Sequence, residues 1–318
     1  MPNYNFKREA TVYMYIGTKY YALPLEDISF SQNFKTKNYA KKTLHEPHRY
    51  FKDTSITEAN AADFDLTMLL ESSSTLDAVK DALLKYETGT SNIRTFDLFI
   101  KTPNSSWKLT KCIPTNSVFL IEKLRELRLQ ISGEASKLER FTGTIPTNDI
   151  VTGDSSFQVI HYFKVALGGS TLANVVSVSV ELQNDTEWLK AENIHDALAV
   201  TSQSNTIYPT NFVLSGRTLA GSIRQYLTEN SIGDAQTWAH NTSINIEAGP
   251  ALGSGYVFNI PTCTYTTRLG AGTVYQVSYD WRSNLDLSSS STGLDNICLL
   301  YTSPSPRDRT RSRMPSSA

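Results

Sequence analysis

Apolar and polar residues alternate along much of this chain, and this alternation constrains the fold more than any other feature. The clearest instance is VVSVSVEL, where every second position is apolar: Val176, Val178, Val180 and Leu182. Successive side chains of a β-strand point to opposite faces, so this spacing predicts a strand with one buried face. The 16 Tyr and 13 Phe also suit half-buried strands. We therefore expect a mainly β protein.

The predicted elements occur twice in the same order. Residues 14–33 and 164–184 each contain a strand, a tight turn at Gly17 or Gly168, and a second strand. In both halves a long polar segment follows, and then a strand, a helix and three more strands. We interpret this repeated order as a tandem duplication.

The tripeptide Ile-Pro-Thr begins at Ile113 and at Ile260, within corresponding strands of the two halves. A third copy at Ile145 lies between the halves and is accidental. Because proline cannot donate a hydrogen bond to a strand ladder, Pro114 and Pro261 should each mark a bulge or a strand edge.

Two segments depart from the period of two and predict amphipathic helices of about three turns. Their apolar residues recur at intervals of three and four, which places them on one helical face. In the first half these residues are Leu76, Val79, Leu83 and Tyr86. In the second half they are Leu219, Ile223, Tyr226 and Leu227.

The predicted fold class is mainly β (α+β), with two tandem β-sandwich or half-barrel domains, each flanked by one α-helix. The first domain is expected at residues 1–140, a linker at 141–156, and a divergent second copy at 157–286. Residues 287–318 are expected to be a disordered end. Within it, residues 299–318 resemble a translated sequencing-adapter read-through, so we exclude them from fold reasoning as non-native. The alternative is a basic tail that contacts nucleic acid.

The composition argues against several functional classes. The formal net charge is −1 for the whole chain and −4 for residues 1–298, which indicates neither a nucleic-acid binder nor a highly acidic protein. The three cysteines are far apart and odd in number, so they predict neither a disulfide framework nor a zinc knuckle. No run of ~18 apolar residues predicts a membrane span, and no signal peptide is evident. We expect a soluble protein that is assembled in a cytoplasm.

No motif indicates an active site. The sequence lacks the G-x-S-x-G nucleophile elbow, the H-E-x-x-H zinc motif and the G-x-x-x-x-G-K-[ST] phosphate loop. The glycine-rich stretches at 249–255 and 269–272 read as hairpin turns. Weaker alternatives are a metal half-site at His45 and His48, an acid/base pair at Asp63 and Asp65, and base stacking by residues 48–52. We expect no enzyme activity, no catalytic, cofactor-binding or metal site, and no cofactor.

The stretches FKREATVYMYIGTKYYALPLEDISF, ITEANAADFDLTMLL and RTFDLFIKTPNSSWKLTKCIPTNSVFL resemble the N-terminal domain of tail tube proteins of tailed bacteriophages. The resemblance covers most of residues 6–140, and the second half resembles a divergent copy. It implies a structural virion protein, assembled in the host cytoplasm, whose two-domain chains form a trimer with a pseudo-hexameric ring. Stacked rings would form a tube that conducts DNA without sequence-specific binding. The implied partners are other copies and other tail proteins, with no membrane.

The same resemblance implies that the long polar segments at 34–55 and 185–204 are loops that contact the neighbouring ring. The candidate contact residues in them are Phe34, Tyr39, Leu44, His45, Trp188, Ile194 and His195. Alternatively, their apolar members fold back onto their own domain.

A second function also fits a β-sandwich without an active site, namely a receptor- or carbohydrate-binding module of a virion or cell surface. An exposed aromatic shelf would favour that function, and Tyr279 and Trp281 could supply one.

Overall fold

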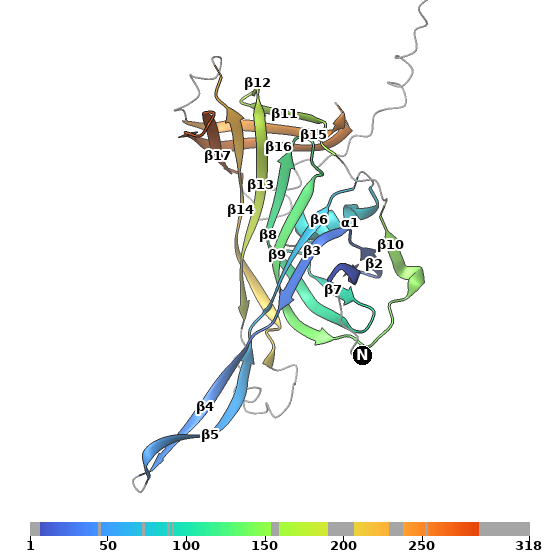
Figure 1. Cartoon of the computed structure of the whole chain (residues 1–318), viewed down its shortest axis with the longest axis vertical. Helices are drawn as coiled ribbons and strands as arrows, with labels where there is room; N and C mark the ends of the chain where they lie inside the picture. Colours follow the sequence, from blue (N-terminus) through green and yellow to red (C-terminus); the bar gives the residue numbers. More distant parts are fainter. Residues whose placement is uncertain are drawn as a thin grey trace, which may run out of the picture.

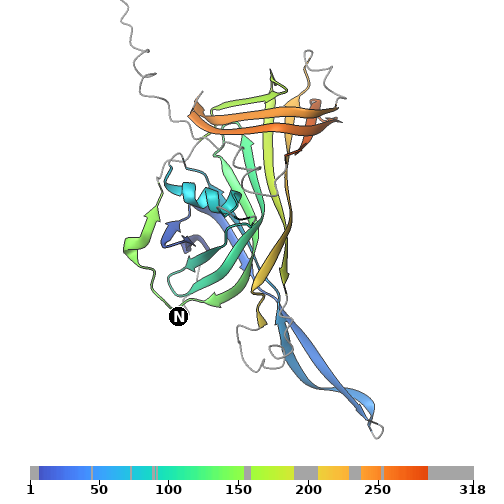
Figure 2. The ribbon, with the colours of Figure 1, turned by 180° about the vertical axis from the view of Figure 1, so that it is seen from behind.

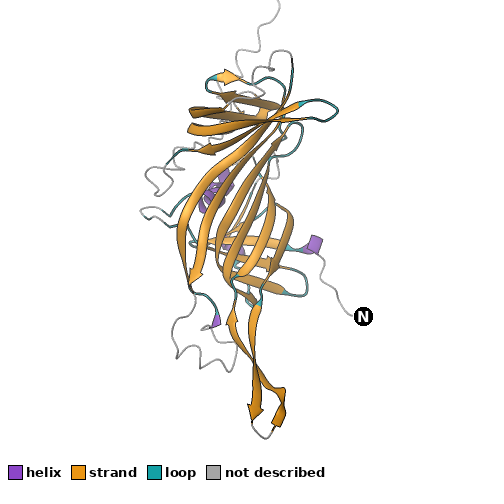
Figure 3. Cartoon of the chain, turned by 90° about the vertical axis from the view of Figure 1, so that its left-hand side faces the viewer, coloured by secondary structure: helices purple, strands orange, loops and turns teal. Residues whose placement is uncertain are grey.

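The computed structural model describes residues 7–43, 46–71, 74–87, 90, 92–153, 159–189, 207–228, 238–251 and 254–285. For residues 37–43, 46–55, 57, 74 and 254, only the backbone is described. The prediction of a mainly β chain is confirmed (Figure 3).

In its described residues, the first half contains nine strands, one α-helix and two short 3-10 helices. The strands are β1 (Thr11–Ile16), β2 (Lys19–Ala22), β3 (Leu25–Ser31), β4 (Phe34–Thr43), β5 (Glu46–Ala59), β6 (Ala62–Leu69), β7 (Phe96–Lys101), β8 (Ser106–Glu122) and β9 (Arg128–Arg140). The helices are η1 (Lys7–Glu9), η2 (Ser74–Leu76) and α1 (Asp77–Leu84).

The second half has eight described strands and follows the 3-10 helix η3 (Thr147–Asp149). The strands are β10 (Ile150–Thr152), β11 (Tyr162–Leu167), β12 (Ser170–Thr171), β13 (Val175–Leu189), β14 (Asn211–Tyr226), β15 (Trp238–Ala251), β16 (Ser254–Gly270) and β17 (Gln276–Ser283).

The two halves share one strand order. In the first half, neighbouring strands pair in the order β2-β1-β7-β8-β9-β6-β3. In the second half the order is β12-β11-β15-β16-β17-β14-β13. All these pairs are antiparallel, and β13 also pairs with β8. The halves therefore belong to one 15-stranded sheet, while β4 and β5 form a separate two-stranded hairpin that projects from the body (Figure 1).

Local signals account for several of these features. Gly17 and Gly168 have φ angles of 64° and 59°, a left-handed conformation that glycine adopts without strain, and each lies in the predicted hairpin turn. The ladder between β8 and β9 shifts register after Pro114, and the ladder between β15 and β16 shifts register across Pro261. The prediction that both prolines mark bulges is confirmed.

The predicted first helix is confirmed, because Val79 and Leu83 lie in α1 and are fully buried. The predicted second helix is wrong, because residues 219–226 belong to strand β14. Positions four apart share a face in a strand as well as in a helix, so Leu219 and Ile223 fit both periods. The position between them is Gly221, where an added Cβ would lie 2.6 Å from the Trp281 ring. This glycine hides the alternation that would have indicated a strand.

The segment predicted as a linker, 141–156, contains regular structure. It includes η3 and β10, and β10 pairs in parallel with β2 at the outer edge of the first half. Figure 2 shows residues 141–153 running along the outside of the body.

Candidate assembly interfaces

The junction between the halves is a continuous β-ladder. Seven residue pairs join the end of β8 to β13, from Glu122 with Ser177 to Asn116 with Gln183. The Asn184 side chain is buried, and its Nδ2 donates to the Pro114 carbonyl at 2.8 Å, next to the β8 bulge. Behind the ladder, the rings of Phe119 and Phe258 meet edge to face with centroids 5.1 Å apart. One hydrophobic core therefore extends through both halves.

Helix α1 and the turn after it also hold the second half. Lys80 is buried, pairs with Asp77, and lies over the Tyr256 ring with its Nζ 5.3 Å from the centroid. From the second half, Arg217 donates to the Leu84 carbonyl at 2.7 Å and lies 4.4 Å from the Tyr86 ring centroid. These contacts desolvate cations against aromatic faces, which strengthens the cation–π attraction.

The part of the sheet that crosses the junction consists of eight strands in the order β3-β6-β9-β8-β13-β14-β17-β16. Strand β3 forms one end, and among the described residues it pairs only with β6. The last residues of β16, 267–270, form the other end. Among the described residues, they pair only with β17. Unpaired edges of this kind can bind a further strand.

The two open edges correspond to the two strands that meet inside the chain. In the shared strand order, β3 occupies the place of β13, and β16 occupies the place of β8. Leu269 faces the core side at the end of β16, because it is paired with buried Val277. It is 48% exposed, whereas Ile121 at the end of β8 is fully buried against β13. The β16 edge therefore exposes an apolar position that β13 covers in the first half.

The comparison with protein families then identifies the class of protein. The model of the bacteriophage baseplate tube protein family matches residues 2–290. The chain belongs to this family. A search of curated proteins found no match.

Membership in the baseplate tube family confirms a phage tail-related structural protein of the virion, and it implies contacts with other tail proteins. Within the described residues, no helix is long and apolar enough to cross a membrane.

The segment at 34–55, which was predicted to be a contact loop, is a β-hairpin. Its residues 44–45 lie outside the described residues. The prediction of a loop is therefore wrong: the backbones of β4 and β5 pair from Phe34 with Ala59 to Thr43 with Glu46, with three register shifts. The signal was weak because β4 and β5 lack the clean apolar alternation of a strand with one buried face.

The structure places the predicted contact residues differently. Phe34 is 40% exposed at the base of the hairpin, and its ring lies 6.2 Å from that of Tyr208. Tyr39 is in β4, paired through its backbone with Asp53. Trp188 is in β13, half-buried, and its ring lies 5.5 Å from that of Phe212. The remaining four lie outside the described residues: Leu44, His45, Ile194 and His195.

The second predicted loop, 185–204, is also partly regular, because Asp185–Leu189 continue β13 and pair with β14. Residues 190–204 lie outside the described residues. The open edges of β3 and β16 were missed by sequence reasoning, because edge exposure depends on strand order and not on local pattern.

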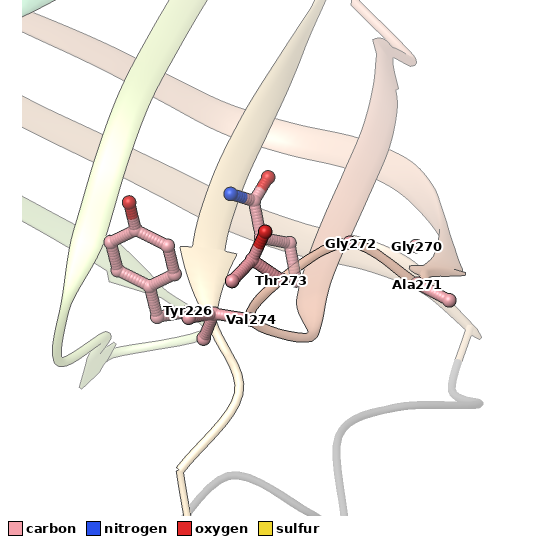
Figure 4. Close-up of a pocket in the computed structure, with 7 residues that line it drawn as sticks. Tyr226, Gly270, Ala271, Gly272, Thr273 and Val274 are labelled. Carbon is pink, nitrogen blue, oxygen red and sulfur yellow. The ribbon is translucent and has the colours of Figure 1, made fainter.

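The described residues offer little to a small ligand. Asp63 and Asp65 are exposed on β6, and the Ser132 hydroxyl donates to Asp65 at 2.6 Å. No described group of three potential metal ligands is close enough to hold a metal ion. A cavity of about 400 Å³ at the β16–β17 turn is lined by Tyr226, Gln276 and residues 270–274, none of which carries a charge (Figure 4). The glycine-rich stretch at 269–272 runs from the end of β16 into the turn before β17, so the predicted hairpin turn is confirmed.

Tyr279 and Trp281 do not form an exposed aromatic shelf. They are 1% and 3% exposed, on the core side of β17. The predicted aromatic shelf for carbohydrate binding is therefore wrong, because the period of two in β17 places both rings on the buried face.

Proposed function

We propose that this chain is a non-catalytic subunit of the phage tail tube, and that its copies assemble into stacked rings enclosing a DNA-conducting channel. Membership in the baseplate tube family supports the setting. The observation that carries the proposal is the junction of β8 with β13, because it demonstrates a way to join two units edge to edge.

The proposed ring repeats that junction between chains. The β3 edge of one copy would pair with the β16 edge of the next, in the place that β13 and β8 occupy inside the chain. The shared strand order supports a tandem duplication, in which each chain contributes two similar units to the ring. Three chains would then give a pseudo-hexameric ring with every internal edge paired, which removes the exposed edges of an open sheet.

The outward face of the eight-stranded part suits a channel wall. Directly paired residues form two rows across this face. One row contains Ser29, Asp65, Ser132, Asn116 and Gln183, and the other contains Ser179, Ser222, Asp280 and Thr266. These side chains are uncharged or acidic, but the same face also carries four arginines, at 128, 224, 268 and 282. Arg128 pairs with Glu26 and Arg268 pairs with Asp280, so acidic side chains on the wall compete with DNA phosphates for these cations. We propose that assembly takes place in the host cytoplasm.

Electron microscopy of the purified chain without residues 299–318 tests the proposal. We expect rings or hollow tubes, and a protein that stays monomeric at high concentration would refute it. The variant Leu269→Asp should remain folded but lose ring formation, because it places a charge on the proposed β16 edge. The control Leu124→Asp changes a 65% exposed leucine at the turn between β8 and β9, away from both edges, and should still form rings.

A further inference from the structure

The large sheet has two ends besides the open edges of β3 and β16. Along its main path these ends are β10, which lies beside β2, and β12, which lies beside β11. Strand β12 contains only Ser170 and Thr171, and so short an edge offers little backbone to another strand. The other end depends on β10, because without it β2 would be the outermost strand. We call residues 141–153, which include β10, the strap.

Strand β2 has the composition of a strand that pairs readily. Tyr20 and Tyr21 are aromatic, and aromatic side chains favour strands. On the outer face, the Tyr20 ring lies 4.7 Å from the ring of Tyr15 and 5.3 Å from that of Phe99, measured between centroids. On the other face, Tyr21 packs against the core. Because β2 is supported on both faces, an uncovered β2 edge would be a rigid site for a strand of another copy.

The strap is fastened to the first half at both ends. At its start, the Phe141 N–H donates to the Ser106 carbonyl at 2.8 Å, and the Phe141 ring meets the Phe99 ring with centroids 4.9 Å apart. At its end, Gly153 lies so close to the buried Glu71 that an added Cβ would collide with the Glu71 carboxylate. The strap is therefore a packed part of the first half as well as a connection to the second.

Between these two ends, β10 covers the backbone of β2. The strands pair in parallel, from Ile150 with Tyr20 to Thr152 with Ala22. Within the described residues, no other segment pairs with this side of β2, and Figures 1 and 2 show the strap along the outside of the first half.

The strap does not offer an equivalent edge of its own. Strand β10 has three residues, and the exposed polar residues of η3 precede it. Short strands and polar flanks are features that keep edges from pairing. The strap thus replaces a supported aromatic edge with a blunt one.

We propose that the strap is an edge guard, which stops copies of the chain from pairing through β2 and leaves only the β3 and β16 edges for assembly. A ladder of three residues is weak between separate molecules. It is sufficient here because the strap belongs to the same chain, so its effective concentration at β2 exceeds that of a competing strand. The inference rests on the proposed ring assembly and adds how pairing through the wrong edge is prevented.

Replacement of residues 144–152 by a Gly/Ser segment of equal length tests the guard in the full chain. The halves stay tethered, but the β10 ladder and the buried Ile145 are lost. A Leu269→Asp background weakens the proposed β16 contact. In sedimentation velocity, the replaced chain should self-associate about tenfold or more strongly than the background alone. In hydrogen exchange, the peptide that contains β2 should exchange faster in the diluted monomer and more slowly after association.

Two further variants show whether the added association uses the β2 edge. Tyr20→Lys in the replaced chain should return association to the level of the background, because a charge on an edge strand disfavours pairing. The matched control Thr147→Gly with Asn148→Ser changes exposed strap residues outside β10 and should associate like the background. If circular dichroism shows that the replaced chain does not fold, Ile150→Ser with Val151→Ser takes its place.

The outcomes separate the guard from the tube function. If the folded strap variant associates no more strongly than the background, or if Tyr20→Lys leaves the added association unchanged, the guard is overturned. Rings or tubes formed by wild type would still support the tube function. If wild type forms neither rings nor tubes but the strap variant gains association that Tyr20→Lys removes, the guard stands and the tube function fails.

Discussion

The variant Phe119→Ala tests whether the halves of the chain are one folding unit. Phe119 is 3% exposed at the end of β8, where it packs edge to face on Phe258 of the second half. Deleting a buried phenylalanine side chain costs about 3–5 kcal/mol, through lost burial and the cavity left behind. About 0.5–1.5 kcal/mol of that loss comes from the aromatic pair itself. Since a domain is stable by only about 5–15 kcal/mol, this loss is readily measured.

Urea unfolding followed by tryptophan fluorescence and by circular dichroism measures the effect. Trp107 lies in the first half, whereas the other three tryptophans, at 188, 238 and 281, lie in the second. A background with Trp107→Phe therefore reports the second half alone. We expect one transition, coincident by all probes, with a lower midpoint and an unchanged slope.

Two unfolding transitions would contradict a shared core. So would a lower urea midpoint that only probes of the first half detect. The matched control is Tyr275→Ala, which removes an aromatic ring that is 56% exposed. It should change the free energy of unfolding by no more than about 0.5 kcal/mol.

Three further predictions follow from single positions. Gly221→Ala should destabilise the chain by about 1–3 kcal/mol or more, because the new Cβ would lie 2.1 Å from the Ser179 carbonyl oxygen. Gly216→Ala serves as the control, because its new Cβ would approach only the Asp185 side chain, with Oδ2 at 3.1 Å. If both variants lower the free energy of unfolding in urea equally, close packing at Gly221 is refuted. Glu134 has a raised pKa in the folded chain, so stability should fall as pH rises from the ordinary glutamate pKa through the raised one. Glu134→Gln should flatten this dependence in unfolding midpoints measured between pH 4 and 8, and an unchanged dependence would contradict it. Burial raises the pKa of the Cys263 thiol to about 11, so it is ionised to roughly one part in a thousand at pH 8. In a Cys298→Ser background, a disulfide reagent should therefore modify Cys263 and buried Cys112 at least ~100-fold more slowly in the native chain than in urea. Rapid labelling of the native chain would show that these thiols are accessible.

Features that depend on neighbouring residues were predictable from the sequence. The alternation in residues 175–182 indicated β13, and the glycines at 17 and 168 marked hairpin turns that the structure contains. Pro114 and Pro261 marked bulges for a local reason too, because a residue without an N–H cannot continue a ladder.

Features that depend on distant partners were not predictable in this way. Residues 219–226 fit a helix until the packing of Trp281 on Gly221 is known. Tyr279 and Trp281 could have been a surface shelf until the sheet assigned them to its buried face. Phe34–Thr43 looked like a loop because β4 and β5 pair with each other and not with the body.

By itself, the sequence determined the strand-rich character of the chain, the first helix, the hairpin turns at Gly17 and Gly168, the bulges at Pro114 and Pro261, and the resemblance to tail tube proteins. Only the tertiary structure decided which strands are neighbours, and with that the junction of β8 with β13 and the open edges of β3 and β16. The physical reason is that alternation specifies which face of a strand is buried, whereas the partners of its backbone hydrogen bonds carry no pattern in the sequence.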